Sequence, residues 1–232
     1  MKNISIKNLT VDFPIFGMKS RSLKNKLIQS ISGGAIFSDN DNLTIRALDN
    51  ITIDLEEGDR VALVGHNGSG KSTLLRTIAG IYEPTKGFIE VNGSIVTLLD
   101  IFLGMDEDAT GYENIIARGL VMGKTIKEMK SLVDDIVTFS GIGNFVNMPM
   151  RTYSSGMAIR LAFSTSTCFD ADIVLMDEWL SVGDKDFQAK SIDRLNKFIE
   201  NAKIVIVATH DQDFIRKFSN KTINLDHGKI LY

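Results

Sequence analysis

GHNGSGKST, residues 65–73, directly follows the apolar run RVALV at 60–64 and opens the helix-forming segment KSTLLRTIAGIY at 71–82. It matches the pattern G-x-x-x-x-G-K-[ST] in full. Glycines let backbone N–H groups curve around phosphate oxygens without a Cβ clash, and the start of a helix adds a favourable dipole. The alternative is a glycine-rich turn that binds nothing. The strand–loop–helix context favours a phosphate-binding loop, which we call the P-loop (residues 65–73).

Two side chains of the P-loop suit a nucleoside triphosphate. Lys71 is expected to reach the β- and γ-phosphates, and the Ser72 hydroxyl is expected to hold Mg²⁺. We interpret His66, at a variable position, as a spacer rather than a catalyst. The loop by itself therefore predicts an NTPase that uses Mg²⁺. The expected nucleotide contacts in the loop are Gly65, His66, Asn67, Gly68, Ser69, Gly70, Lys71, Ser72 and Thr73.

Acidic residues end the apolar run IVLMDE at 173–178. Asp177 is expected to hold the water shell of Mg²⁺, and Glu178 to polarise the attacking water as a general base. The alternative is a strand that simply ends in solvated acids, which the P-loop upstream disfavours. His210 follows the run IVIVAT, and we expect its strand to neighbour that of Asp177. We favour a contact of His210 with the γ-phosphate over a purely structural histidine.

The composition is that of a globular protein with no overall preference for nucleic acid. The chain has 232 residues, of which 44% are hydrophobic and 24% charged, and a formal net charge of −3. Its single cysteine, Cys168, allows no disulfide framework, which fits a reducing compartment. No N-terminal signal pattern and no apolar run of transmembrane length occur. We therefore expect any role at a membrane to depend on a partner or a surface contact.

Apolar patterns predict the secondary structure. NISIKNLTVDF at 3–13 alternates as in a strand, ITIDLEEGDRVALVG at 51–65 predicts two strands joined at residues 57–58, and TINLDHGKILY at 222–232 predicts a hairpin. The runs that end at Asp177 and His210 are continuous, as in strands buried on both faces. Because helical segments alternate with them, we predict an α/β fold with a mostly parallel core sheet.

Helical periodicity marks the middle of the chain, in segments 111–123 and 154–169 and in a helix between them. The helix between them is expected to begin with a capping box of Thr125 and Glu128 and to end at Gly141.

TYSSGMAIRLAFS, residues 152–164, resembles the signature segment of ATP-binding cassette (ABC) proteins, usually written LSGGQ. Tyr153 replaces Leu, Ser155 replaces the first Gly, and Met157 replaces Gln. A helix start of small residues that offers a hydroxyl and free N–H groups to a phosphate is retained. The order P-loop, signature segment, LMDE, SVGD and ATH is similar to that of ABC ATPases and covers essentially the whole chain.

The resemblance implies nucleotide contacts outside the P-loop. In the family the signature segment binds the ATP held by the other subunit, so Ser154, Ser155 and Gly156 are expected at the nucleotide of a head-to-tail homodimer. Asp184, in SVGD, matches the D-loop and is expected to couple the two sites. The position of the family's Q-loop glutamine holds Asp100, whose carboxylate is expected to bind Mg²⁺ or water.

The adenine-stacking aromatic is the least defined part of the expected site. Phe13, after NLTVD, is the best candidate by position, and Phe37 is the second. The alternative is that either ring belongs to the core.

The expected organisation is one ABC ATPase domain over residues 1–232 with the P-loop NTPase fold. Residues 1–98 and 165–232 form the core, with an antiparallel β part at the N-terminus. Residues 99–164 form a helical subdomain that contains the signature segment, and residues 15–42 form an insert specific to the subgroup.

The insert has two interpretations. KSRSLKNKLIQSISGG at 19–34 is basic and places leucine and isoleucine at helical spacing, and SDNDN at 38–42 predicts a loop. The helix is expected either to lie at lipid headgroups or the pyrophosphate of a lipid-linked substrate, or to pack its apolar side chains on the domain.

TYSSGM, DEWLSVGD followed by FQAK, GIYEPTKG and TGYENI together are similar to the ATPases of bacterial polysaccharide exporters, and the insert is similar to O-antigen exporters in particular. This resemblance implies a separate integral-membrane permease subunit, a lipid-linked glycan as cargo, and a place on the cytoplasmic face of the bacterial inner membrane. The C-terminal glycan-binding domain of some members is expected to be absent, because the sequence ends at Tyr232.

Other functions stay open at this point. One is export of capsule, teichoic acid or another substrate class. A second is a soluble ABC ATPase acting in DNA repair or on the ribosome, which the single cassette and the negative charge disfavour. A third is an inactive cassette, which the intact Lys71, Asp177, Glu178 and His210 disfavour.

Overall fold

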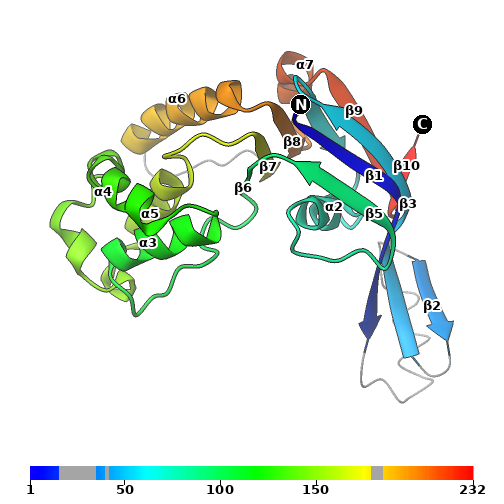
Figure 1. Cartoon of the computed structure of the whole chain (residues 1–232), viewed down its shortest axis with the longest axis horizontal. Helices are drawn as coiled ribbons and strands as arrows, with labels where there is room; N and C mark the ends of the chain where they lie inside the picture. The colour runs from blue at the N-terminus through cyan, green and yellow to red at the C-terminus, as the bar shows by residue number, and fades with distance from the viewer. Residues whose placement is uncertain (16–34, 40–41, 179–184, 232) are drawn as a thin grey trace. The chain divides into compact units, whose positions relative to one another are not determined.

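The computed structural model describes residues 1–15, 35–39, 42–178 and 185–231. The chain divides into two compact units (Figure 1). The first unit comprises Met1–Gly93, Leu175–Glu178 and Lys203–Tyr232, and the second comprises Ser94–Val174 and Trp179–Ala202.

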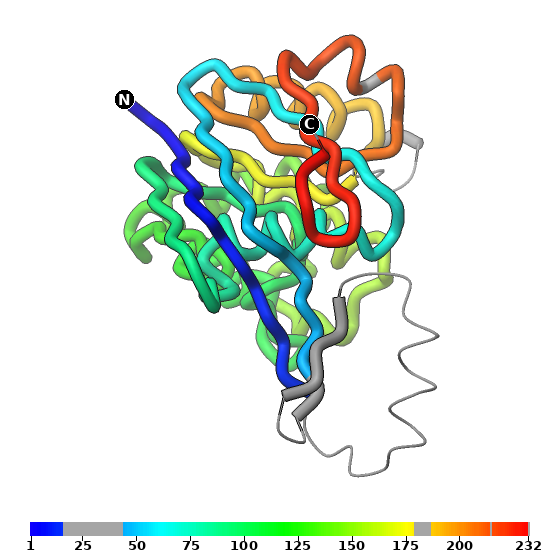
Figure 2. Tube along the Cα trace, turned by 90° about the vertical axis from the view of Figure 1, so that its right-hand side faces the viewer, coloured from blue at the N-terminus to red at the C-terminus, as the bar shows by residue number. Residues whose placement is uncertain are grey.

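An antiparallel sheet forms the N-terminal part of the first unit, with the strand order β2-β3-β1-β5. Figure 2 shows β1 running beside β3 along most of its length, and the register begins with Asn3 opposite Glu56. Alternate residues of β1, including Ile4 and Ile6, are fully buried, as the period of a half-buried strand requires. The strands are β1 (Asn3–Ile15), β2 (Ala35–Asp39), β3 (Asn42–Glu56) and β5 (Lys86–Asn92).

Within the first unit, a second sheet has the order β10-β9-β4-β8-β7, to which β7 contributes Leu175–Asp177. β4 pairs in parallel with both β8 and β9, and every residue of β8 is buried. The strands are β4 (Arg60–Val64), β7 (Ile173–Asp177), β8 (Ile204–Ala208), β9 (Lys221–Asp226) and β10 (Lys229–Leu231). Helix α2 (Lys71–Ile78) follows β4, and α7 (Gln212–Phe218) connects β8 to β9. The P-loop therefore lies at the carboxyl end of a central strand, where parallel sheets bind ligands.

The second unit is mainly helical. Its apolar core consists of Ile115, Met129, Ile136, Ile142, Met150 and Leu161. The helices α3 and α4 approach closely at Gly119, where a Cβ atom would lie 2.2 Å from the Met129 side chain. The elements are β6 (Ile95–Thr97), α3 (Gly111–Val121), α4 (Ile126–Ser140), η1 (Gly143–Asn147), η2 (Met150–Thr152), α5 (Ser155–Ser166) and α6 (Lys185–Asn201).

Most of the expected elements are confirmed. The capping box of Thr125 and Glu128 is present, Gly141 ends α4 with φ 70°, and β9 and β10 form the C-terminal hairpin. The loop expected at 38–42 is wrong in part, because Ser38 and Asp39 end β2 and Asn42 begins β3, where they are paired across the sheet. The helix expected within 19–34 lies outside the described residues.

The bounds expected for the helical subdomain, 99–164, stay a prediction.

Among the described residues, no helix combines the length and the apolar character that crossing a membrane requires.

Candidate nucleotide-binding site

The P-loop is closely enclosed by its own unit. A Cβ atom at Gly65 would lie 2.2 Å from the Leu225 carbonyl oxygen and 2.6 Å from the Ser69 hydroxyl. At Gly70 (φ 108°) it would lie 2.9 Å from the Ala47 carbonyl oxygen. Both positions therefore require glycine for the fold of the loop as well as for the close approach of a phosphate.

Lys71 begins α2 and turns its amine back over the P-loop. Its Nζ donates to the carbonyl oxygens of Gly65 (2.6 Å) and His66 (3.1 Å), and the residue is only 9% exposed. Burial lowers the pKa of Lys71, while the charges of Asp177 and Glu178 act to raise it. A largely buried cation at the start of a helix is suited to stabilise the charge of a bound phosphate.

Ser72 and Asp177 meet across the first unit. The Ser72 hydroxyl donates to Asp177 Oδ2 over 2.5 Å, although the two residues are 105 positions apart. A hydroxyl and a carboxylate are the oxygen ligands that Mg²⁺ prefers beside a phosphate. The chemistry of these two residues fits Mg²⁺, and their role in holding it stays a prediction.

Glu178 adopts an uncommon backbone conformation directly after β7. Its φ is 66°, in the left-handed region that costs a non-glycine residue about 1–2 kcal/mol. The Glu178 N–H donates to the Ala208 carbonyl oxygen at 2.8 Å, which fixes this conformation against β8. The side chain is exposed beyond the strand end, and such an outlier is typical of functional sites.

His210 also lies beyond the end of its strand and is exposed. The residue before it, Thr209, is buried, and its N–H donates to the Leu63 carbonyl oxygen at 3.1 Å. The neighbouring order of β4, β8 and β7 thus places the P-loop, His210 and the two acids at one edge of the sheet. The expectation that the strand before His210 neighbours that of Asp177 is confirmed.

The turn between β9 and β10 contacts the P-loop, which sequence reasoning missed. Gly228 N–H donates to the Ser69 carbonyl oxygen at 2.9 Å, and His66 Nε2 lies 3.0 Å from Asp226 Oδ1. Ser69 is fully buried, and among the described residues its hydroxyl oxygen has no hydrogen-bond partner. The separation of 160 residues between His66 and Asp226 leaves no local signal that predicts this contact.

Phe13 is half-buried in β1, and its ring meets the edge of Tyr82 with centroids 5.1 Å apart. The role of Phe13 in stacking adenine stays a prediction. The backbone of Phe37 lies in β2, and its side chain is outside the described part of the structure.

The signature segment (residues 153–157) begins α5 in the second unit. Ser154 caps this helix, and its hydroxyl accepts from the Met157 N–H at 3.2 Å. Ser154 and Ser155 are exposed and line a groove of about 380 Å³. Met157, which replaces the family's Gln, packs against the apolar core of this unit. The serine side chains expected at a phosphate are therefore exposed, and the departure at Met157 has a packing explanation.

Two further residues, Asp100 and Asp184, are expected at the nucleotide. Asp100 is exposed, and its carboxylate accepts from the Phe102 N–H at 3.0 Å within its own turn. Its charge raises the pKa of the buried Arg118, against the larger effect of burial. Asp184 lies outside the described residues. The roles of Asp100 and Asp184 stay predictions.

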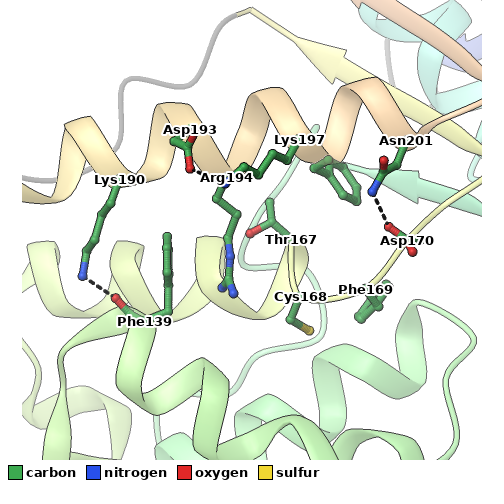
Figure 3. Close-up of a pocket in the computed structure, with 11 residues that line it drawn as sticks. Phe139, Thr167, Cys168, Phe169, Asp170, Lys190, Asp193, Arg194, Lys197 and Asn201 are labelled. Carbon is green, nitrogen blue, oxygen red and sulfur yellow. Dashed lines mark hydrogen bonds and ion pairs between the residues drawn. The ribbon is translucent and has the colours of Figure 1, made fainter.

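A different pocket, of about 440 Å³, lies beside α6 in the second unit (Figure 3). Two of its polar side chains are engaged within the unit: Lys190 donates to the Phe139 carbonyl oxygen, and Asn201 donates to Asp170. None of the described residues expected in the nucleotide site lines it. We therefore interpret it as a packing feature of this unit.

Comparison with known proteins identifies the family. The family described as ABC transporter matches residues 48–181. The O-antigen export system ATP-binding protein RfbE of Yersinia enterocolitica is 42% identical, over 99% of this chain and 97% of its own length. RfbB of Myxococcus xanthus, with the same description, is 38% identical over 90% of this chain and 47% of its own length. TagH of Staphylococcus haemolyticus, a teichoic acids export ATP-binding protein, is 38% identical over 98% of this chain and 83% of its own length.

The fold is also that of solved ATP-binding cassettes. The dimeric cassette MJ0796 in a post-hydrolysis state with ADP and phosphate has a TM-score of 0.68 over 99% of this chain and 97% of its own, at 22% identity. A second dimeric structure of MJ0796 has a TM-score of 0.66 at 21% identity. With the family match and the 42% identical relative, these findings show that the chain is an ATPase of the ABC transporter family.

Proposed function

We propose that this chain is the ATP-hydrolysing subunit of an exporter that moves a lipid-linked polysaccharide of O-antigen type across the bacterial inner membrane. The observation that carries the proposal is the relative RfbE, which aligns along nearly the full length of both chains. The intact arrangement of Lys71, Ser72, Asp177 and Glu178 supports an active rather than a degenerate cassette.

Binding and orientation of ATP fall to the P-loop in this proposal. Its N–H groups and the start of α2 hold the phosphates, and the Lys71 amine exchanges its loop carbonyl partners for phosphate oxygens. Ser72 and Asp177 hold Mg²⁺, which neutralises charge on the phosphates when bound. Most of the catalysis then comes from positioning and charge stabilisation.

Water activation falls to Glu178. Its carboxylate accepts a proton from the water that attacks the γ-phosphate, and its fixed backbone directs it away from the strand. His210 contacts the γ-phosphate from the end of the neighbouring strand.

Two copies of the chain form a head-to-tail homodimer, in which Ser154, Ser155 and Gly156 of one copy cover the ATP of the other. The exposed serines at the start of α5 support this arrangement. The closing motion of the dimer is transmitted to a separate integral-membrane permease subunit. Contact with this subunit places the ATPase at the cytoplasmic face of the membrane.

Lys71→Ala in cells of the source bacterium tests the export function. Hydrolysis falls because a phosphate-binding cation is lost, so we expect loss of surface polysaccharide and accumulation of lipid-linked glycan inside the cell. Lys127→Ala, at an exposed position of α4, is the matched control and is expected to leave both pools unchanged. If both pools stay normal in Lys71→Ala cells, the polysaccharide assignment is wrong.

Teichoic acid export is the second candidate, because TagH of Staphylococcus haemolyticus is 38% identical. The same experiment separates the two functions, since the chemistry of the glycan that accumulates identifies the cargo.

A further inference from the structure

Two of the three histidines in the chain meet at one place beside the P-loop. His66 of the P-loop and His227 of the β9–β10 turn lie with Asp226 so that one ligand atom of each falls within 4.8 Å of the others. We propose that His66, Asp226 and His227 form a binding site for a divalent transition metal such as Zn²⁺, distinct from the Mg²⁺ ligands Ser72 and Asp177.

The distances between the ligand atoms suit such an ion. His66 Nε2 is 3.0 Å and His227 Nε2 is 3.8 Å from Asp226 Oδ1. Ligands about 2.0–2.2 Å from a tetrahedral zinc ion are separated by about 3.3–3.6 Å, which lies between these two values. Two imidazoles and one carboxylate are a common zinc ligand set that leaves a fourth position open.

Both ring nitrogens of His66 face oxygen atoms. Its Nδ1 lies 2.8 Å from the Asn67 carbonyl oxygen, which only accepts, so Nδ1 carries the proton. In neutral imidazole Nε2 is then an acceptor, yet it faces the carboxylate oxygen of Asp226, which is also an acceptor. A metal ion between these atoms satisfies both, and the contact with the carbonyl orients the ring as it does for metal-bound histidines.

The backbone holds both halves of the site in place. Gly228 N–H donates to the Ser69 carbonyl oxygen at 2.9 Å, and Asp49 N–H donates to the Gly228 carbonyl oxygen at 2.8 Å. His227 is in the left-handed region with φ 45°, a conformation that this anchored turn imposes. The three side chains are 40%, 43% and 59% exposed in the order His66, Asp226 and His227, so the ion has a path from solvent.

A metal at this site ties the P-loop to the C-terminal hairpin. His66 supplies the ligand through its side chain, while its carbonyl oxygen accepts from Lys71 Nζ at 3.1 Å. Metal binding therefore restricts the segment that positions the phosphate-binding lysine. We expect Zn²⁺ to raise the midpoint of thermal unfolding in a concentration-dependent way, because an ion that binds only the folded state stabilises it.

The test uses the tag-free, chelator-treated chain with Co²⁺ as a spectroscopic probe and Zn²⁺ as competitor. We expect one Co²⁺ per chain with visible d–d bands, displaced by Zn²⁺. His227→Asn and Asp226→Asn each remove one ligand and are expected to weaken binding by at least about tenfold. Asn accepts the left-handed conformation at 227, and near-UV circular dichroism confirms that each variant is folded.

Two further variants control for other ligands. His210→Gln removes the third histidine, and Cys168→Ser removes a thiol whose pKa burial raises to about 12. Both are expected to bind Co²⁺ like the parent chain. Absence of stoichiometric Co²⁺ binding would overturn the proposal. It would indicate that a proton, and not a metal ion, lies between His66 and Asp226. Binding that is unchanged in folded His227→Asn and Asp226→Asn would overturn it too.

Discussion

The P-loop and the signature segment are both helix starts expected at phosphates, but their glycines stand in different surroundings. At Gly65, in the first unit, an added Cβ atom would lie 2.2 Å from the Leu225 carbonyl oxygen. At Gly156, in the second unit, the nearest atom within 4 Å would be the Ser154 hydroxyl oxygen, at 3.9 Å. The first glycine is required by the packing of its own unit, whereas the described packing around the second does not require one.

This difference indicates what each glycine is for. A glycine inside a helix destabilises it by about 0.5–1 kcal/mol relative to alanine, so Gly156 lowers the stability of α5 without a packing benefit there. A requirement for glycine at this position would come from a ligand outside the unit. A nucleotide held by a second copy of the chain, as we propose, supplies that requirement.

The largest effect is expected at the acid beyond β7, on the P-loop side of the comparison. Glu178→Gln removes the proposed general base and keeps the shape of the side chain, so ATP hydrolysis should fall by about 10²–10⁴-fold. ATP binding should persist, because Lys71 and Ser72 are unchanged. Phosphate release and binding of a fluorescent ATP analogue measure the two properties. Glu83→Gln, at an exposed acid, is the control, and a normal rate in Glu178→Gln would refute the assignment.

The second prediction tests how rigid the P-loop is. Gly65→Ala places a methyl group against backbone and should abolish ATP binding and lower the free energy of unfolding by about 1–3 kcal/mol. Gly80→Ala is the matched control, since its φ of 74° is also positive but no atom lies within 4 Å of the added Cβ. It should lose stability but bind ATP. Equal ATP affinity in the two variants would contradict the enclosed P-loop.

The third prediction makes the corresponding glycine-to-alanine change in the signature segment, where the effect on stability is expected to be opposite. Gly156→Ala should raise the free energy of unfolding by about 0.5–1 kcal/mol and still lower ATP hydrolysis, because the methyl group meets the nucleotide of the partner copy. Thermal unfolding and steady-state phosphate release measure these opposite changes. A stabilised variant with full activity would show that Gly156 does not approach a nucleotide.

The fourth prediction concerns the helix cap of the signature segment. Ser154→Ala removes the hydroxyl that accepts from the Met157 N–H and should cost about 1 kcal/mol of stability. Thr125→Ala removes the corresponding cap of α4 at a similar cost. Only Ser154→Ala should also lower ATP hydrolysis. The rate is measured at a temperature below the unfolding transition of both variants. Equal hydrolysis in the two variants would leave Ser154 as a cap alone.

The sequence predicts the parts of the site that local chemistry determines. The P-loop, the strand that ends at Asp177 and the capping box at Thr125 each combine a short pattern with a strand or helix boundary, and the structure has these elements where they are expected.

Long-range pairing accounts for what sequence reasoning missed. Ser38 and Asp39 look like loop residues, but pairing with β3 outweighs their low strand propensity. The contact of His66 with Asp226 joins residues 160 positions apart, and the left-handed backbone of Glu178 depends on Ala208 in another strand. No pattern within a short window contains this information.

The mass of the Glu178→Gln protein in solution, measured by sedimentation with saturating ATP and with ADP, tests the proposed sharing of ATP between two copies most directly. The account predicts twice the 25.6 kDa of a single chain with ATP and Mg²⁺, and a monomer with ADP. A protein that binds ATP but stays monomeric at every concentration tested would contradict it.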